Sequence, residues 1–404
     1  MELCSQELCT GCMACYNACN HNAIKLLADK EGFLRPQIDT NYCVNCGQCS
    51  SSCPILTEKN LCGRIPTSVY ATWAQNKSTV LKSSSGGVFT LLANYVLKQH
   101  GVIFGAKFDE KTKSVIHVQI ESLDQLYLLQ GSKYVQSFVG KTYLSCRSHL
   151  KQGRKVLFVG TPCQIAGLLS YLKGKYIENL YTVDLVCHGV PSPMIFSKYL
   201  SYLENVYQSQ VTNFNFRDKR WSWNRFNVKC SFQNGKVYYG TWEEDPYLRG
   251  FLRELFLRPS CHNCKFSEPR RYSDITLGDF WGFKERQKEK MNLDKGVSLV
   301  LVNTEKGENI FRASEGKAVC YSRDYKDAID AQQALRKCFP PSPLREKFWE
   351  DYNKMSFVDM LNKYCYPNAL PFTKKIKYRI GHLAVYKVFI DLIKMIKHKI
   401  NNHV

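Results

Sequence analysis

The segment CTGCMACYNAC at residues 9–19 shares its cysteine spacing with the segment CVNCGQCSSSC at residues 43–53. Each has the form C-x-x-C-x-x-C-x-x-x-C. Pro54 follows the second segment, whereas Asn20 stands at the equivalent position after the first. Thiolate sulfur is a soft ligand, so a repeated set of closely spaced cysteines indicates metal binding. The two runs therefore predict a metal-binding unit over residues 1–58.

The spacing is typical of bacterial two-cluster ferredoxins. In these proteins three cysteines of a run bind one 4Fe–4S cluster, and the fourth binds the neighbouring cluster. Zinc also accepts thiolates, but its sites use pairs of cysteines rather than two complete sets of four. The pattern therefore predicts two clusters that transfer single electrons. Cluster I takes Cys9, Cys12, Cys15 and Cys53, and cluster II takes Cys43, Cys46, Cys49 and Cys19.

Length and composition limit the remaining possibilities. The chain has 404 residues, enough for one or two further domains. Its 19 cysteines, with neither a secretion leader nor an apolar run of about 18 residues, favour a cytoplasmic location. The formal net charge of +21 favours an acidic redox partner, a phosphate-bearing cofactor or an anionic membrane surface. Since no nucleic-acid-binding motif accompanies the charge, no nucleic acid is expected.

Strands and helices alternate beyond a polar linker at residues 57–66. Asn234-Gly235 between two alternating segments predicts a hairpin. The chain is therefore expected to be α+β. It combines a two-cluster ferredoxin domain (1–58), an α/β domain with a mixed sheet (67–335) and a helical C-terminal extension (336–404). Strands are predicted at 102–108, 115–120, 155–160, 181–186, 226–232, 236–242 and 298–302, and helices after 83–87 and at 165–172.

Four further cysteines stand in distinctive settings. Cys163 follows Pro162 at a strand-to-helix turn, and Cys187 ends the next strand. Both should project from the same edge of a parallel sheet, where α/β folds place ligands. Cys261 and Cys264 form a C-x-x-C pair. A third cluster, half of a zinc site and buried packing thiols all remain open on this basis.

Six ordered motifs resemble the coenzyme F420 hydrogenase/dehydrogenase beta-subunit family. The resemblance is greatest to bacterial members with an N-terminal two-cluster ferredoxin domain, often encoded beside surface-polysaccharide genes. It implies that the central domain binds FAD and a third 4Fe–4S cluster, whose ligands would be Cys163, Cys187, Cys261 and Cys264. The motifs are SSSGGVF (83–89), GSKYVQS (131–137), GTPCQIAG (160–167), DLVCHGVPSP (184–193), CHNC (261–264) and DITLGDFWG (274–282).

The resemblance also suggests a flavin site at Ser85, Gly86, Gly87, Lys133 and Tyr134. Glycines at a helix N-terminus allow backbone N–H groups to approach a phosphate closely, and a lysine adds positive charge. A glycine-rich helix cap beside a surface lysine is the simpler explanation of the same residues.

Several other features have structural explanations at least as good as functional ones. The basic and aromatic segment 217–225 could clamp an anionic substrate or cofactor, or form a solvated loop with two packing tryptophans. Asp274, Asp279 and Trp281 could shape a flavin pocket or form a turn. His188 could tune a cluster, shuttle a proton or make one hydrogen bond. The remaining cysteines lack partners at ligand spacing and are interpreted as packing residues: Cys4, Cys62, Cys146, Cys230, Cys320, Cys338 and Cys365.

The C-terminal segment is basic and amphipathic. It could lie on an anionic membrane surface, or dock on the body of the protein, which is the more common fate of such helices. The basic residues Lys374, Lys375, Lys377 and Arg379 precede a predicted helix with polar positions Lys387, Asp391, Lys394 and His398.

These observations predict an iron–sulfur flavoprotein oxidoreductase. Electrons would pass between the clusters and FAD to reduce or oxidise an organic substrate, with a ferredoxin or flavodoxin as redox partner. No catalytic residue is assigned, because the cofactors carry the chemistry. The substrate, the direction and the use of coenzyme F420 stay open; surface-polysaccharide biosynthesis is the setting that the resemblance implies. The alternative is an electron-transfer subunit of a multiprotein complex without its own substrate.

Overall fold

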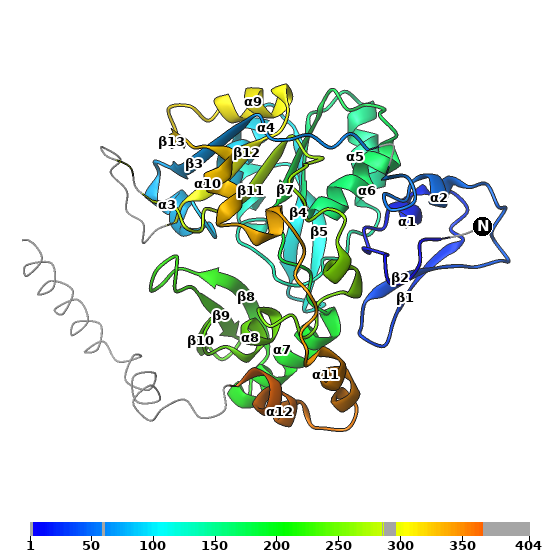
Figure 1. Cartoon of the computed structure of the whole chain (residues 1–404), viewed down its shortest axis with the longest axis vertical. Helices are drawn as coiled ribbons and strands as arrows, with labels where there is room; N and C mark the ends of the chain where they lie inside the picture. The colour runs from blue at the N-terminus through cyan, green and yellow to red at the C-terminus, as the bar shows by residue number, and fades with distance from the viewer. Residues whose placement is uncertain (1–2, 59–60, 285, 287–295, 367–404) are drawn as a thin grey trace, which may run out of the picture.

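The computed structural model of the chain describes residues 3–58, 61–284, 286 and 296–366. Within these residues it contains a two-stranded, a three-stranded and an eight-stranded sheet (Figure 1). The largest sheet is mixed, since it has both parallel and antiparallel strand pairs. This confirms the predicted α+β chain with a mixed central sheet. The basic segment and the helix predicted beyond residue 366 lie outside the described residues.

The N-terminal unit holds both cysteine runs beside an antiparallel hairpin. Each run enters a short helix directly after a left-handed residue, Met13 at φ 62° or Gly47 at φ 76°. The two runs therefore fold as a structural repeat. The elements of the unit are α1 (Ala14–Ala18), β1 (Ile24–Ala28), β2 (Leu34–Ile38) and α2 (Gln48–Ser51).

The central sheet has the strand order β13-β3-β12-β11-β7-β6-β4-β5. Its middle strands β11, β7, β6 and β4 run parallel to one another, and the other neighbouring pairs are antiparallel. The strands are β3 (Ser68–Ala74), β4 (Val102–Asp109), β5 (Ser114–Ile120), β6 (Val156–Gly160), β7 (Leu180–Leu185), β11 (Ile275–Asp279), β12 (Ser298–Val302) and β13 (Ala318–Ser322).

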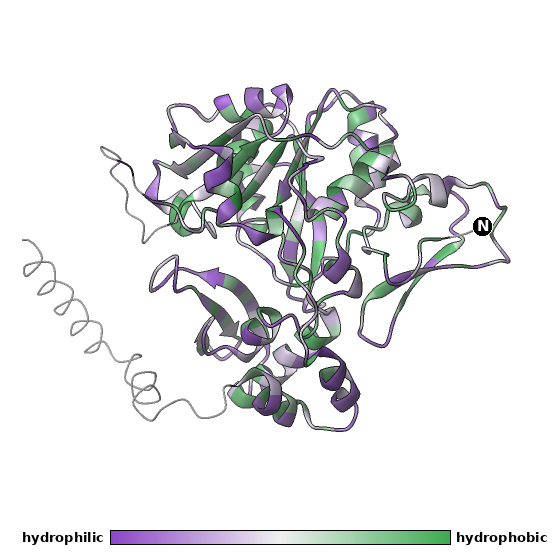
Figure 2. Cartoon of the chain, in the orientation of Figure 1, coloured by the Kyte–Doolittle hydropathy of each residue, from purple (hydrophilic) through white to green (hydrophobic). Residues whose placement is uncertain are grey.

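Each face of the central sheet is buried by helices. Figure 2 shows hydrophobic residues along its strands, as expected for a sheet covered on both sides. On one face pack α4 (Val88–Leu97) and α9 (Glu305–Arg312). On the other pack α5 (Thr142–Lys151), α6 (Pro162–Leu172) and α1 of the N-terminal unit. The N-terminal unit therefore shares a hydrophobic core with the central sheet.

The three-stranded sheet forms a second, aromatic-rich core with nearby helices. Its strands are antiparallel in the order β10-β9-β8. The elements are α7 (Pro193–Tyr207), β8 (Val211–Asp218), β9 (Asn227–Phe232), β10 (Val237–Thr241), α8 (Pro246–Phe251), α11 (Arg345–Tyr352), α12 (Phe357–Met360) and the π-helical turn η6 (Leu361–Cys365). The remaining elements are α3 (Lys77–Leu81), α10 (Tyr325–Asp330) and the 3-10 turns η2 (Leu123–Leu128), η3 (Pro259–Asn263) and η5 (Gln333–Leu335).

The predicted strands are confirmed at β4, β5, β6, β7 and β12, and the hairpin is confirmed as β9 and β10. The helix predicted from residue 165 begins earlier, at Pro162. Thr161 caps it, with the backbone N–H of Thr161 donating to Gln164 Oε1 at 2.9 Å. Strands β1, β2, β3, β8, β11 and β13 were not predicted. None of the described helices is long and apolar enough to cross a bilayer.

A buried carboxylate begins helix α8. Asp245 is fully buried and accepts hydrogen bonds from the backbone N–H of Leu248 at 2.8 Å and from the Tyr238 hydroxyl at 3.0 Å. The Tyr199 hydroxyl donates a third. Despite these donors, burial raises the pKa of Asp245 to about 6.

The raised pKa predicts a pH-dependent stability difference between the native chain and Asp245→Asn. The folded-state pKa lies above the unfolded value of about 3.9, so the contribution of Asp245 is full below that value. It is lost as pH rises through about 6. The native protein should therefore lose stability relative to Asp245→Asn as the pH rises from about 5 to about 7.5. The thermal unfolding midpoint of the variant minus that of the native protein should increase over this range. A difference that stays constant across this range would contradict the prediction.

Candidate functional site

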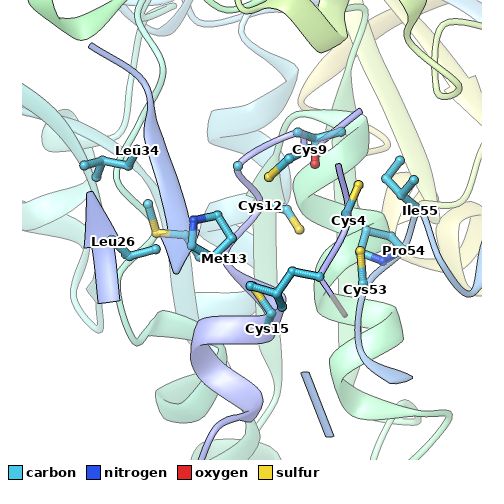
Figure 3. A pocket seen from close by; sticks show the side chains of 14 residues that line it. Cys4, Cys9, Cys12, Met13, Cys15, Leu26, Leu34, Cys53, Pro54 and Ile55 are labelled. Carbon is cyan, nitrogen blue, oxygen red and sulfur yellow. The ribbon is translucent and has the colours of Figure 1, made fainter. Parts of the chain in front are cut away.

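Cavity I lies in the N-terminal unit and is lined by Leu26, Leu34 and a group of cysteines (Figure 3). Four of these cysteines are the predicted cluster I ligands. The fourth cysteine of the second run therefore crosses to the first run, as the ferredoxin pattern requires. A further cysteine, Cys4, lines the same cavity. The thiols of cavity I are Cys4, Cys9, Cys12, Cys15 and Cys53.

Cavity II is a second cysteine-lined cavity of the N-terminal unit. It is lined by the four predicted cluster II ligands, Cys19, Cys43, Cys46 and Cys49. The backbone N–H of Ala23 donates to Cys19 Sγ at 3.3 Å, a contact that suits a thiolate ligand. Cys46 is exposed, so cavity II is the N-terminal cavity with a ligand at the surface.

Cavity III lies at one edge of the central sheet, where the parallel strands β6, β7 and β11 end. Cys163 stands in the first turn of α6 after β6, and Cys187 follows β7. Turn η3 adds Cys261, and Cys264 comes directly after it. All four predicted positions line this one cavity. A fifth cysteine, Cys338, also lines it, and its thiol donates to the His262 carbonyl oxygen at 3.1 Å.

The surroundings of cavity III disfavour free thiolates and favour bound ones. Burial raises the pKa of the Cys187 thiol well above its usual range, and that of Cys261 to about 11. Thr161 Oγ1 lies 3.1 Å from Cys163 Sγ, and the backbone N–H of Val190 donates to Cys261 Sγ at 3.4 Å. Iron supplies the positive charge that these thiols need in order to ionise. The donor set therefore fits an iron–sulfur cluster.

Among the described residues, no group of three or more His, Cys, Asp or Glu side chains is arranged to hold a single metal ion. A single zinc ion draws its sulfur ligands to about 2.3 Å from one centre. A 4Fe–4S cluster instead spreads its four thiolates over four iron atoms. Thiols spaced too widely for a single zinc ion are therefore still compatible with a 4Fe–4S cluster.

Cavities I and III are neighbours. Thr10 lines both of them. Helix α1 of the N-terminal unit also packs on α6, so closely that a Cβ on Gly167 would lie 2.9 Å from Cys12 Sγ. The first turn of α6 carries Cys163. The cluster I ligands therefore lie beside those of cavity III.

A buried arginine joins the two cavities. Arg258, which has no exposed surface, donates from Nε to the Cys9 carbonyl at 2.7 Å and from Nη2 to the Leu34 carbonyl at 3.2 Å. Its Nη2 also lies 3.6 Å from Cys9 Sγ, and its Nη1 donates to Gln136 Oε1 at 2.8 Å. A side chain on Gly11 would collide with this guanidinium, since a Cβ there would lie 2.6 Å from Nη1. Arg258 therefore fixes the N-terminal unit against the central domain beside a cysteine ligand.

The predicted flavin residues lie around the loop before α4. Ser85 Oγ donates to the Val297 carbonyl at 2.7 Å, and the Gly86 N–H donates to Ser298 Oγ at 2.9 Å. A Cβ on Gly86 would lie 2.3 Å from the Thr72 carbonyl, so glycine is required by close packing on the sheet. Gly87 caps α4 at φ 92°. The Gly86 N–H is thus already bonded within the protein, which gives this residue a structural role.

Cations gather at the same loop. Ser132 donates from both its N–H and its hydroxyl to Ser84 Oγ, at 2.7 and 2.9 Å. The next residue, Lys133, donates to the carbonyls of Leu128 and Gln130. Lys219 donates to the Ser85 carbonyl at 2.9 Å. Burial lowers the pKa of both lysines to about 7, so an anionic group beside them would restore their charged form.

Part of the segment 217–225 meets the DITLGDFWG motif. Arg217 Nη1 donates to Asp279 at 2.9 Å, and Trp223 Nε1 donates to the same carboxylate at 2.6 Å. The rings of Trp223 and Trp281 stack at 4.8 Å between centroids. Arg217 Nη1 also donates to the Tyr134 hydroxyl at 3.2 Å, which connects this group to the predicted flavin residues. Trp223 is buried, as expected for a packing tryptophan, whereas Trp221 is exposed. The interpretation of the segment as a solvated loop is wrong for Arg217, which is buried.

Two other candidates have defined places. His188 lines cavity III; its Nε2 lies 3.1 Å from Glu254, and its ring packs on Phe339. Asp274 accepts from the N–H and hydroxyl of Thr182 at 2.8 Å each, and this contact holds β7 to the start of β11. Asp274 is thus structural.

Three residues at these cavities had no signal in the sequence: Cys4, Cys338 and Arg258. Each contacts residues far away in the chain or stands outside any ligand spacing. A buried arginine is recognisable only once its partners are placed.

Comparison with known proteins agrees with the predicted resemblance. Residues 8–56 match the 4Fe–4S dicluster domain, and residues 153–327 match the C terminus of the beta subunit of coenzyme F420 hydrogenase/dehydrogenase. The chain is therefore an iron–sulfur protein of the electron-transfer type. Its central part is similar to the coenzyme F420 hydrogenase/dehydrogenase beta-subunit family, which confirms the predicted resemblance.

Two individual proteins are similar to the chain. The coenzyme F420-dependent sulfite reductase of Methanocaldococcus jannaschii is 26% identical over 323 residues, which are 70% of this chain and 48% of that protein. The chain thus spans about half the length of the reductase. A chain of the F420-reducing NiFe hydrogenase complex from Methanosarcina barkeri shares 17% identity at a TM-score of 0.44, over 74% of this chain and 91% of that chain.

The contacts of Arg258 predict a stability change. Arg258→Gln removes a charged donor from two partly buried carbonyl groups, those of Cys9 and Leu34, and should lower the free energy of unfolding by about 1–3 kcal/mol. Arg312→Gln is the matched control, since the Arg312 side chain is 64% exposed. Chemical unfolding of anaerobically purified protein measures both. Equal losses in the two variants would show that the Arg258 contacts do not stabilise the fold.

Proposed function

We propose that the chain is an iron–sulfur flavoprotein oxidoreductase with three 4Fe–4S clusters. The observation that carries this proposal is the adjacency of cavities I and III, which share Thr10 and both lie near Arg258. An N-terminal cluster pair that only stabilised the fold would need no second set of four cysteines beside it. A continuous series of cavities, in contrast, is what electron transfer requires.

The order of the cavities defines a route for electrons. Cavity II has an exposed ligand in Cys46, with the exposed side chains of Tyr42 and Val44 close by in sequence. Electrons would enter or leave there, through contact with a redox partner such as a ferredoxin or flavodoxin. Cavity I comes next, and cavity III lies against it. Helix α6 carries both Cys163 and the surface on which Cys12 packs.

The cationic loop around Ser84 and Ser85 would hold an anionic flavin cofactor. Bound there, FAD supplies the exchange between single electrons and electron pairs. Lys133, Arg217 and Lys219 would neutralise its phosphates, since all three contact this loop or lie in the neighbouring segment 130–134. The stacked pair of Trp223 and Trp281 would bound the site on one side.

Coenzyme F420 is the first electron-pair partner to test, because the matching family and the sulfite reductase are both named for it. A role in surface-polysaccharide biosynthesis rests on the resemblance alone. Contact with the inner face of a membrane rests on the basic C-terminal segment, which lies outside the described residues. The second candidate function is an electron-transfer subunit without its own substrate. A substrate that reduces or reoxidises the flavin of the isolated chain favours the enzyme, whereas a subunit needs its partner.

Cofactor content tests the three-cluster proposal. Anaerobically purified protein should contain about twelve iron atoms and one FAD per chain. Cys163→Ser combined with Cys187→Ser should lower the iron content by about four atoms and leave the N-terminal pair in place. About eight iron atoms in the native protein, unchanged in the double variant, would remove the third cluster and with it the route into the central domain.

Flavin binding has its own test. Lys133→Met should lower the FAD content of the purified protein several-fold, because it removes a cation from the loop that holds the phosphates. Lys111→Met, at an exposed turn, is the control and should retain the native FAD content. Equal FAD in both variants would place the flavin elsewhere or show that Lys133 does not contribute to binding.

A further inference from the structure

Cavity I contains one thiol more than a 4Fe–4S cluster can use. A cluster takes four cysteine ligands, one for each iron atom. Five cysteines line the cavity, and Cys4 is the one outside the ferredoxin pattern. Cys4 precedes the first run by five residues and is only partly buried. Packing alone therefore does not explain its place among the ligands.

Cys4 points toward one particular ligand. Its thiol shares a hydrogen bond with Cys53, the ligand that crosses over from the second run. Figure 3 shows the two residues on neighbouring segments at the same side of the cavity. The backbone N–H groups of Ile55 and Leu56 also contact the Cys53 thiol, so Cys53 is held in place by its own segment. Cys4 thus stands beside the iron position that Cys53 would bind.

Cavity II provides an internal comparison. The two runs are structural repeats, and Cys19 crosses to cavity II as Cys53 crosses to cavity I. The described residues that line cavity II include four cysteines and no fifth. A role for Cys4 should therefore appear at cluster I and be missing at cluster II.

We propose that Cys4 is a reserve ligand of cluster I that can bind the iron atom otherwise held by Cys53. In the native chain Cys53 binds that iron atom, and Cys4 stands beside it in cavity I without a bond to iron. When Cys53 is removed, an iron–sulfur bond forms at Cys4 and the thiol proton leaves to solvent. No electron is exchanged in this replacement. The inference rests on the N-terminal clusters of the proposed function, and not on the flavin or the third cluster.

The test compares four variants purified anaerobically from the full chain: Cys4→Ala, Cys53→Ala, Cys4→Ala with Cys53→Ala, and Cys19→Ala. Iron and sulfide per chain are measured, together with the electron paramagnetic resonance spectrum after reduction with dithionite. Cys4→Ala and Cys53→Ala should each retain the native iron content. The double variant and Cys19→Ala should each lose about four iron atoms.

The outcomes separate the inference from the proposed function. A Cys53→Ala variant that loses as much iron as the double variant overturns the reserve role of Cys4. Insoluble Cys53→Ala protein also overturns it, because a rescued cluster would keep the N-terminal unit folded. A native protein without N-terminal clusters would instead contradict the proposed function itself.

Discussion

The guanidinium of Arg258 is the interaction on which the arrangement of the cavities depends. It is buried, and four acceptors from the N-terminal unit and the central domain surround it. Removing a charge from water is unfavourable unless every donor is matched, so such a contact fixes its surroundings in one arrangement. Here that arrangement places Cys9 of the N-terminal unit next to the residues that line cavity III. A positive charge between two sites that would each hold an anionic cluster also lowers the repulsion between them.

The parallel strands supply the second constraint. Since β6, β7 and β11 run in the same direction, their carboxyl ends meet at one edge of the sheet. Cys163 and Cys187 come from two of these ends, and Arg271 on the approach to β11 pairs with Asp184 of β7 at 2.8 Å. Ligands in α/β folds gather at this edge for the same reason. The chain therefore joins a general property of parallel sheets to a ferredoxin unit that packs on the adjacent helices.

The sequence predicted those parts of the cavities whose residues are close together in the chain, and missed those whose contacts join distant residues. Cavities I and II follow from the runs at 9–19 and 43–53, because their ligands are close in sequence and in a known pattern. Cys163 and Cys187 could be placed together from the two strands that precede them. The C-x-x-C pair at 261–264 was visible in the sequence, but its assignment to the same cluster as Cys163 came only from the resemblance, since no spacing connects the two. Arg258 could not be found, because its partner Cys9 is 249 residues away.

In the predicted flavin region, too, contacts between residues far apart in the chain could not be predicted. Gly86 was predicted as a phosphate-binding residue, yet packing against Thr72 already explains it. The sequence did not show whether Arg217 and Lys219 bind an anion or face solvent. In the structure, strand β8 and the residue after it place both side chains against the loop at Ser84 and Ser85. Strand β8 itself was not predicted, because a bulged edge strand alternates imperfectly. The cations of the site therefore became visible only with the tertiary structure.

The most direct test of the account is whether the clusters of cavities I and III are neighbours. The electron paramagnetic resonance spectrum of the fully reduced protein can be compared with that of a Cys261→Ser, Cys264→Ser variant. If the two clusters are adjacent, their magnetic interaction disappears in the variant and the signal of the N-terminal pair changes shape. An N-terminal signal that is identical in both proteins would contradict direct electron transfer between cavity I and cavity III.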